Sequence, residues 1–193
     1  VIREDLRIFR VHFDNWSLES QVASTDKIVK TLEDLKAKGF LYEKEGALWF
    51  SSTRFGDDKD RVVRKSDGLF TYLAPDIVYH KHKYERGFDL LVDILGPDHH
   101  GYIPRIKAAA QALGKDAGAL EVLIIQLATI FRDGKQLRMS TRAGEFITLR
   151  EVAREVGTDA GRFFMLMRQV SQQLEFDIDL AKKQVPENPV YYV

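Results

Sequence analysis

Apolar residues recur at helical spacing early in the chain and then in short runs. Residues 24–39 predict a helix, because their apolar side chains share one helical face and Gly39 follows as a stop. Residues 40–50 and 62–72 are apolar runs interrupted by Glu-Gly and Asp-Gly pairs, which are typical of hairpin turns. The first third of the chain is therefore predicted to be a helix followed by hairpins.

From residue 75 onward, helices and strands alternate. Residues 75–87 predict a helix with Pro75 in its first turn, 89–95 a short buried strand, and 103–114 a second helix. The run 120–131 predicts one further strand that is covered on both faces, because its apolar residues are nearly continuous. This order forms a β-α-β unit, in which ligands bind at the carboxyl ends of the strands.

The last part of the chain is predicted to be helical. Thr148 and Glu151 form a capping box for a helix that ends at Gly157. Residues 159–169 predict another amphipathic helix. Together the elements predict an α/β fold.

Composition narrows the class of protein. The 193 residues are 45% hydrophobic and 30% charged, as in a globular chain with a buried core. The 29 basic residues equal the 29 acidic ones, so no overall charge indicates a nucleic acid or a membrane as partner. The absence of cysteine excludes disulfides and thiolate metal sites and fits a reducing compartment. No apolar run reaches membrane-spanning length.

Both ends of the chain predict a longer protein. The chain begins Val-Ile-Arg-Glu-Asp, without an initiator methionine or a signal-peptide pattern. It stops on the apolar aromatic run ENPVYYV. We expect the sequence to continue on both sides.

The segment KQLRMSTRAGEF, residues 135–146, follows a predicted turn at Asp133-Gly134. It carries two cations and two hydroxyls, from Arg138, Ser140, Thr141 and Arg142. A polyphosphate needs such groups, because phosphoryl and nucleotidyl transfer depend on positioning and charge stabilisation. The segment alone leaves a solvated polar turn equally open.

A second candidate cluster is TYLAPD. Tyr72 and Asp76 flank the start of the predicted helix, so a phenol and a carboxylate can face a pocket at its positive end. A carboxylate beside a rigid hydroxyl suits a guanidinium or ammonium ligand. The alternative is that Asp76 is an ordinary first-turn residue favoured by the helix dipole.

The third cluster is GPDHHGY, residues 96–102, at the end of a predicted strand. Asp98, His99 and His100 are metal-ligand types, yet two adjacent side chains seldom bind one ion. Asp98 is also placed to hold ribose hydroxyls at the end of such a strand. The position favours a nucleotide over a metal.

The segment FGDDKDRV supplies three more carboxylates, Asp57, Asp58 and Asp60. It lacks the spacing and the terminal glutamate of a calcium loop. We expect a solvated loop.

These clusters occur together with further motifs and in one order. The stretches are FGDDKDRVVRKSDGLFTYLAPDIVYH, RGFD, GPDHHGYIPR, LRMSTRAGEFITLREV, GTDAGRFF, FDIDLA and ENPVYYV. In combination they resemble the arginyl-tRNA synthetases, which are class I enzymes with a nucleotide-binding catalytic fold. The resemblance runs from about residue 46 to the end of the chain. It implies ATP-dependent activation of L-arginine to arginyl-adenylate and transfer to tRNA(Arg) in the cytoplasm, with Mg²⁺ accompanying ATP.

The resemblance implies roles for individual residues. Tyr72 and Asp76 would form the arginine pocket, with Asp76 binding the guanidinium and His100 beside them. A lysine ammonium cannot satisfy the same bidentate contact. Gly96 and Asp98 would line the adenosine side.

Residues 138–142 would be the K-M-S-K-S loop at the pyrophosphate end of ATP. The loop reads Arg138, Met139, Ser140, Thr141 and Arg142. Arg138 keeps a cation in place of the first lysine, whereas Thr141 removes the second. Arg142 stands beside it as a partial substitute.

The other ATP motif of the family, H-x-G-H, is absent from this sequence. None of the five histidines, His12, His80, His82, His99 and His100, stands in that pattern. The resemblance therefore implies a fragment without the N-terminal catalytic half and the C-terminal anticodon-binding domain. Residues 1–66 would be an α+β insertion module, and 67–193 the second half of a Rossmann-like catalytic fold with the C-terminal helices.

Two other functions remain open on the residues alone. A metal-dependent phosphoesterase would use Asp98, His99 and His100, with Asp93 as the nearby additional carboxylate. A non-catalytic RNA-binding relative of a synthetase is the other, although no aromatic-basic stripe is evident in the sequence.

Overall fold

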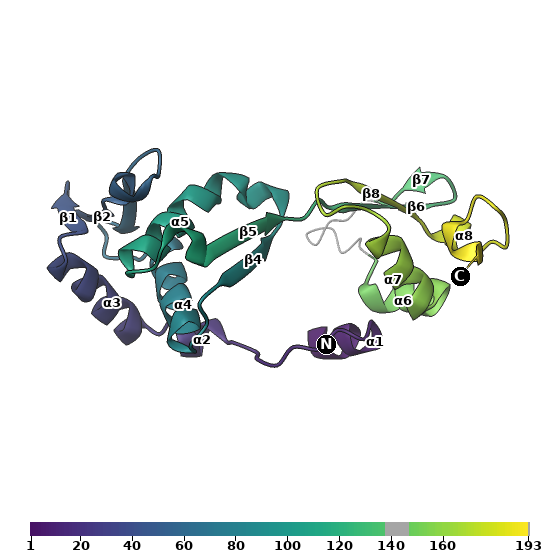
Figure 1. The fold of residues 1–193 in the computed structure, drawn as a ribbon, viewed down its shortest axis with the longest axis horizontal. Helices are drawn as coiled ribbons and strands as arrows, with labels where there is room; N and C mark the ends of the chain where they lie inside the picture. The colour runs from purple at the N-terminus through teal and green to yellow at the C-terminus, as the bar shows by residue number, and fades with distance from the viewer. Residues whose placement is uncertain (138–146, 193) are drawn as a thin grey trace. The chain divides into compact units, whose positions relative to one another are not determined.

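The computed structural model describes residues 1–137 and 147–192 and divides the chain into two compact units (Figure 1). One unit is Trp16–Leu123, and the other combines Val1–Asn15 with Ile124–Val193. These units are defined by contacts. The predicted boundary between an insertion module and a catalytic half at residues 66 and 67 stays a prediction.

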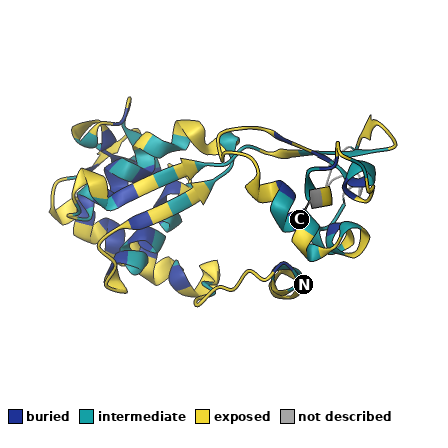
Figure 2. Cartoon of the chain, turned by 45° about the vertical axis from the view of Figure 1, so that its right-hand side comes forward, coloured by how far each residue is buried: buried dark blue, intermediate teal, exposed yellow. Residues whose placement is uncertain are grey.

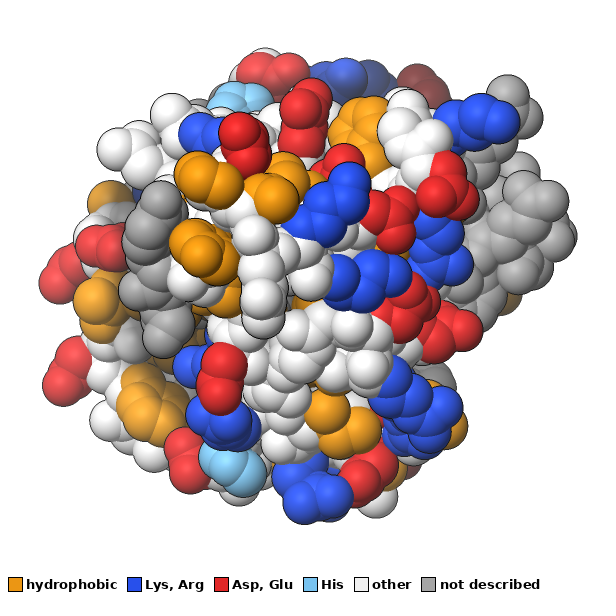
Figure 3. All heavy atoms as spheres, turned by 90° about the vertical axis from the view of Figure 1, so that its right-hand side faces the viewer, with side chains coloured by type: hydrophobic (Ala, Val, Ile, Leu, Met, Phe, Trp, Pro, Cys, Tyr) orange, Lys and Arg blue, Asp and Glu red, His pale blue; other side chains and the backbone are white. Residues whose placement is uncertain are grey.

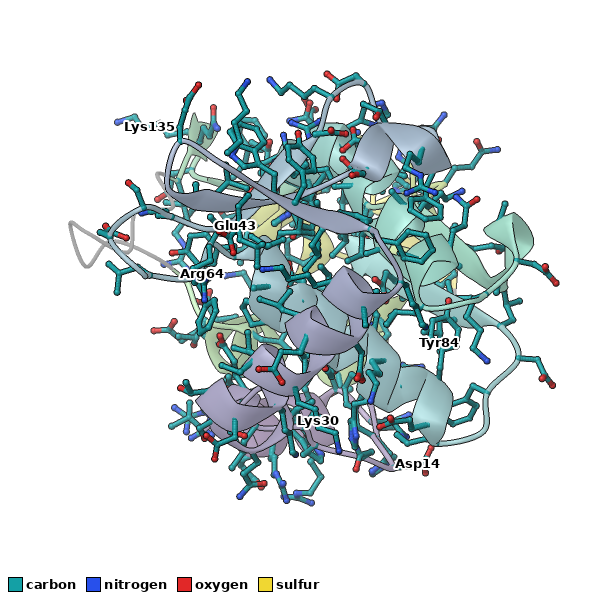
Figure 4. All side chains as sticks on the ribbon, turned by 90° about the vertical axis from the view of Figure 1, so that its left-hand side faces the viewer. Asp14, Lys30, Glu43, Arg64, Tyr84 and Lys135 are labelled. Atoms are coloured by element: carbon teal, nitrogen blue, oxygen red, sulfur yellow. The ribbon has the colours of Figure 1, made fainter. Side chains whose placement is uncertain are left out.

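The first half of unit Trp16–Leu123 contains two helices followed by an antiparallel sheet. Its elements are α2 (Glu19–Val22), α3 (Thr25–Ala37), β1 (Leu41–Lys44), β2 (Ala47–Phe50), η1 (Ser52–Phe55) and β3 (Arg61–Arg64). The strands form an antiparallel sheet in the order β1-β2-β3, which carries Glu43 and Arg64, both labelled in Figure 4. This confirms the predicted helix and the first predicted hairpin. In the second, over 62–72, β3 pairs with the chain that follows only through an antiparallel bridge between Arg64 and Phe70.

The second half of this unit contains the predicted β-α-β unit. Its elements are α4 (Leu73–Glu85), β4 (Leu91–Leu95), η2 (Pro97–Tyr102), α5 (Ile103–Ala112), η3 (Ala117–Ala119) and β5 (Leu120–Ile124). β4 and β5 pair in one sheet, and their arrows run the same way in Figure 1. The helix predicted from Pro75 begins two residues earlier, at Leu73.

The prediction of a single strand over 120–131 is wrong. The run divides into β5 and β6 (Ala128–Arg132), which belong to different sheets. Leu127, between them, is 70% exposed. A continuous apolar run does not reveal such a break, because the composition on its two sides is the same.

The expectations of a buried strand over 89–95 and of cover on both faces for the run 120–131 are also wrong. Burial alternates along β4 and β5 (Figure 2). Leu91 and Leu120 are buried, whereas Val92, Ile94 and Leu123 on the alternate positions are exposed. In the part of the chain that the structure describes, this sheet therefore has one packed face and one open apolar face.

The packed face covers a core shared with α3, α4 and α5. Ile77 on α4, Ile106 on α5 and Leu120 on β5 are almost fully buried. Burying each such side chain stabilises the fold by about 1.5–3 kcal/mol. The packing fixes the starts of α4 and α5, where the candidate site residues lie.

The unit of Val1–Asn15 and Ile124–Val193 has a mixed sheet with helices. Its elements are α1 (Ile2–Ile8), β6, β7 (Lys135–Gln136), α6 (Leu149–Val156), α7 (Thr158–Leu166), β8 (Leu174–Asp177), α8 (Ile178–Ala181) and η4 (Pro189–Tyr192). β6 lies between β7 and β8, antiparallel to the first and parallel to the second.

Two local predictions in this unit are confirmed. Thr148 Oγ1 accepts from the Glu151 backbone N–H at 3.1 Å, and Glu151 Oε2 accepts from the Thr148 N–H at 2.6 Å. Asp133 and Gly134 turn between β6 and β7, with positive φ of 51° and 69°. Both features follow from adjacent residues, which is why the sequence predicts them.

Charges in this unit are paired locally. Glu155 forms ion pairs with Arg132 and with Lys182, the latter at 3.3 Å. Basic and acidic side chains lie beside one another on the face shown in Figure 3. The balanced net charge of the sequence therefore corresponds to mixed signs on this face. Among the described residues, no helix is long and apolar enough to cross a membrane.

Candidate functional site

Asp76 lies in the first turn of α4 and lines a cavity of about 200 Å³. The other lining residues are Ser17, Glu19, Val22, Ala23, Pro75 and Tyr79. α2 packs against α4 and supplies one wall of the cavity. An aspartate that lines a small hollow is a candidate site for a cationic group.

The carboxylate of Asp76 is held by Tyr102, at the end of η2. The Tyr102 hydroxyl donates to Asp76 Oδ2 at 2.5 Å. Burial raises the pKa of Tyr102, and the hydrogen bond and the charge of Asp76 raise it further, well above its usual range. The phenol therefore stays protonated and remains a donor.

The sequence predicts Asp76 and the motif that ends in Tyr102 as candidates but does not show that the two side chains meet. The two residues are 26 positions apart in the chain. The available signal was the position of Tyr102, which closes the loop at the carboxyl end of β4. The structure thus brings the second and third sequence clusters together.

The backbone of Asp76 is held by a buried histidine. His80 Nδ1 lies 2.7 Å from the Asp76 carbonyl oxygen, and Nε2 lies 2.7 Å from Asp93 Oδ2 on β4. Both partners are acceptors, so each ring nitrogen is placed to donate a hydrogen bond. Lys83 Nζ donates to Asp93 Oδ1 at 2.6 Å.

Asp93 lies between His80 and Lys83, which both contact its carboxylate. Burial raises the pKa of its carboxyl, but hydrogen bonds from His80 and Lys83, with their charges, more than offset that effect and lower the pKa to about 2. The network links α4 to β4. Asp93, the carboxylate that the phosphoesterase hypothesis assigned to a metal, is therefore already bonded to His80 and Lys83.

Tyr72 lies outside the cavity of Asp76. Its side chain is 88% exposed. It lines a neighbouring hollow of about 500 Å³, together with Glu19, Ala23, Ile28, Lys65, Phe70, Thr71 and Pro75. The two hollows share Glu19, Ala23 and Pro75. The structure therefore places Tyr72 and Asp76 on adjacent hollows rather than in one.

Gly96, Asp98 and His100 follow β4, at the position that the sequence predicts. A Cβ on Gly96 would stand 2.8 Å from Asp98 Oδ1, so the Asp98 side chain would have to shift to admit one. Asp98 and His100 are exposed, and His99 Nε2 lies 3.6 Å from Asp98 Oδ2. Among the described residues, no group of three potential ligands is placed to hold a metal ion, so nothing there supports the metal hypothesis.

The expectation of a solvated FGDDKDRV loop is wrong for Asp57. Its carboxylate is buried and accepts from Arg61 Nε at 2.7 Å and from the Ser52 hydroxyl at 3.0 Å. Burial raises the pKa of Asp57, but the hydrogen bonds, that of Arg61 foremost, lower it well below its usual range. Asp60 accepts from Thr53 and Tyr42. Asp58 is exposed, although it too forms an ion pair with Arg61.

A family model described as the catalytic domain of class I (R) tRNA synthetases matches residues 1–172. The match covers most of the chain. The chain belongs to this family. The membership confirms the resemblance that the sequence motifs predict and gives a class I synthetase catalytic domain of mixed α/β content.

Relatives and solved structures agree with this assignment. The chain is 53% identical to the arginine–tRNA ligase of Citrifermentans bemidjiense and 56% identical to that of Hydrogenovibrio crunogenus, over 192 residues in each case. Each match covers 100% of this chain, but only 35% of the first protein and 32% of the second. The chain thus spans about a third of the length of the curated relatives.

Among structures, a putative arginyl-tRNA synthetase from Campylobacter jejuni superposes with a TM-score of 0.88 at 42% identity. The match covers 99% of this chain and 41% of that one. Arginyl-tRNA synthetase from Thermus thermophilus gives 0.73 at 16% identity, covering 98% and 42%, which shows the fold alone.

The K-M-S-K-S candidate of this class I synthetase chain lies outside the described residues. Its members are Arg138, Met139, Ser140, Thr141 and Arg142. The geometry described above therefore concerns the hollows beside α4 and the loop after β4.

Substitution Asp93→Asn is expected to destabilise the α4–β4 region at neutral pH. The depressed pKa of Asp93 contributes about 2 kcal/mol above pH ~4, and this contribution is lost as pH falls through about 2. Hydrogen exchange of the α4 amides at several pH values measures this contribution to stability. The exposed Asp89→Asn variant is the control. Equal protection in both variants at neutral pH would contradict the prediction.

Proposed function

We propose that this chain is part of an arginyl-tRNA synthetase, which activates L-arginine with ATP and transfers it to tRNA(Arg). Family membership and the relatives named arginine–tRNA ligase support the proposal. The observation that carries the substrate assignment is Asp76, which is among the residues that line a small cavity and whose carboxylate accepts a hydrogen bond from a phenol. Such a carboxylate suits a planar guanidinium.

The amino-acid side of the site would lie around the two hollows beside α4. Asp76 would bind the guanidinium, Tyr72 would contact the amino acid from the adjacent hollow, and His100 would lie nearby. A lysine ammonium is a single compact charge and cannot form the paired hydrogen bonds of a guanidinium with one carboxylate. This difference would exclude lysine.

The ATP side would lie at the end of β4. Gly96 and Asp98 would line the adenosine, and Arg138, Met139, Ser140, Thr141 and Arg142 would form the loop at the pyrophosphate. Mg²⁺ would accompany ATP and neutralise phosphate charge. With Thr141 at the second lysine position, Arg138 and Arg142 would be the loop cations.

The fold arrangement is part of the proposal. Residues 67–193 would be the second half of a Rossmann-like catalytic fold, and 1–66 a preceding insertion module. The open apolar face of the β4–β5 sheet supports this reading, because large exposed apolar surfaces normally contact other protein. Further catalytic and anticodon-binding parts would belong to the longer protein, in the cytoplasm.

The test is arginine charging by the extended enzyme, meaning a protein of curated-relative length that contains residues 1–193. We expect tRNA(Arg) to be aminoacylated in the presence of arginine and ATP. Charging with another amino acid only would overturn the substrate assignment. Salt-dependent tRNA binding without any charging would favour a non-catalytic RNA-binding relative.

A further inference from the structure

Resting on the proposed function, we propose that Tyr102 is a positioning residue for guanidinium recognition. Its hydroxyl fixes the rotation of the Asp76 carboxylate, so that the plane of the carboxylate matches the planar fork of arginine. Tyr102 would thereby determine specificity for a guanidinium without touching it.

The first step is that the main chain of Asp76 is already fixed. Asp76 is preceded by Leu73 and Ala74 and followed by Ile77, all of which are buried in the core. Its carbonyl oxygen is held by His80, which Asp93 anchors to β4. The freedom that remains at Asp76 is the rotation of its own side chain.

The second step is that Tyr102 removes this freedom. The terminal torsion of an aspartate is broad, so a carboxylate without a partner has no single plane. The Tyr102 hydroxyl at 2.5 Å from Oδ2 selects one orientation. The same contact orients the second oxygen, Oδ1, which a ligand in the hollow would contact.

The third step is that Tyr102 acts from outside the cavity. Asp76 lines the hollow and Tyr102 does not. A ligand therefore reaches Asp76 without displacing the phenol. Tyr102 is itself held in place, because the guanidinium of Arg105 lies 5.5 Å from the centre of its ring and the His99 ring packs edge-on at 6.5 Å.

The consequence for specificity follows from ligand shape. A guanidinium gains two parallel hydrogen bonds only when the carboxylate lies in its plane, whereas an ammonium forms a point contact in many orientations. Loss of the Tyr102 hydroxyl should therefore weaken the binding of arginine more than the binding of lysine. A hydrogen bond to a charged group corresponds to about a tenfold to hundredfold change in affinity.

The experiment compares Tyr102→Phe with the wild type in the extended enzyme, by arginine-dependent ATP–pyrophosphate exchange. We expect the KM for arginine to rise about tenfold to a hundredfold, with the KM for ATP and kcat nearly unchanged. Lysine, tested as a competitive inhibitor, should keep its inhibition constant. The selectivity for arginine over lysine would then fall in proportion.

The matched control is Tyr84→Phe. Tyr84, labelled in Figure 4, is a buried tyrosine on α4 whose hydroxyl donates to the Ala119 carbonyl oxygen at 3.1 Å. Burial also raises its pKa. The Tyr84→Phe variant loses a comparable hydroxyl that does not contact Asp76. We expect its KM for arginine to stay at the wild-type value.

Three results would overturn the proposal. They are an unchanged arginine KM in Tyr102→Phe, an equal rise in the KM values for arginine and ATP, and an equal loss of arginine and lysine binding. These results differ from failure of the proposed function, in which the wild-type enzyme itself shows no arginine-dependent exchange.

Discussion

Substitution Asp76→Ala in the extended enzyme is expected to raise the KM for arginine by about a hundredfold or more, and the KM for ATP by less than about threefold. Removing one partner of a desolvated, hydrogen-bonded charge pair costs roughly 2–5 kcal/mol, and each 1.4 kcal/mol is a factor of ten. ATP lies elsewhere in the proposed site and does not use this carboxylate. Arginine-dependent ATP–pyrophosphate exchange measures both constants.

Asp76→Asn separates charge from shape in the same assay. The amide oxygen can still accept from Tyr102, which donates to Oδ2 in the structure, but the negative charge is lost. We expect an arginine defect close to that of the alanine variant. Equal losses for arginine and ATP would instead mean that Asp76 supports the first turn of α4, as its position next to the buried Ile77 allows.

Local chemistry determines which parts of the fold are predictable from the sequence. The capping box of Thr148 and Glu151 and the turn at Asp133 and Gly134 depend on residues within four positions of one another. The break between β5 and β6 depends on which sheet each strand joins. Which sheet a strand joins depends on partners far away in the sequence, so a uniformly apolar run does not reveal it.

The same distinction applies to the candidate site. Asp76 follows from a motif and a helix start, both of which are local. Tyr102 and Asp93 contact Asp76 and His80 from 26 and 13 positions away, because the path through β4 and η2 returns to α4. For Asp57 the local sequence gives the wrong expectation. Its local sequence predicts a solvated loop, although its partners Arg61 and Ser52 lie only four and five positions away. Spacing within an irregular loop does not show that this carboxylate turns into the protein.

The 193-residue chain by itself is expected to show no detectable charging of tRNA with arginine, a loss on the order of 10⁵-fold or more relative to the extended enzyme. Charging requires ATP, arginine and the tRNA end to be held against one another, and positioning supplies much of the rate enhancement. This sequence carries no H-x-G-H motif. The residues proposed for arginine and for ATP would therefore lack the partner motif that binds ATP from the other half of the site.

Aminoacylation with labelled arginine measures this prediction, with the extended enzyme as the positive control at equal concentration. Circular dichroism checks that the chain has the helix and strand content of a folded protein, so that inactivity reports a missing half-site and not an unfolded sample. Charging by the chain that depends on both arginine and ATP would contradict the prediction. It would place every group needed for adenylate formation within these residues, with Arg138 and Arg142 left to stabilise the pyrophosphate.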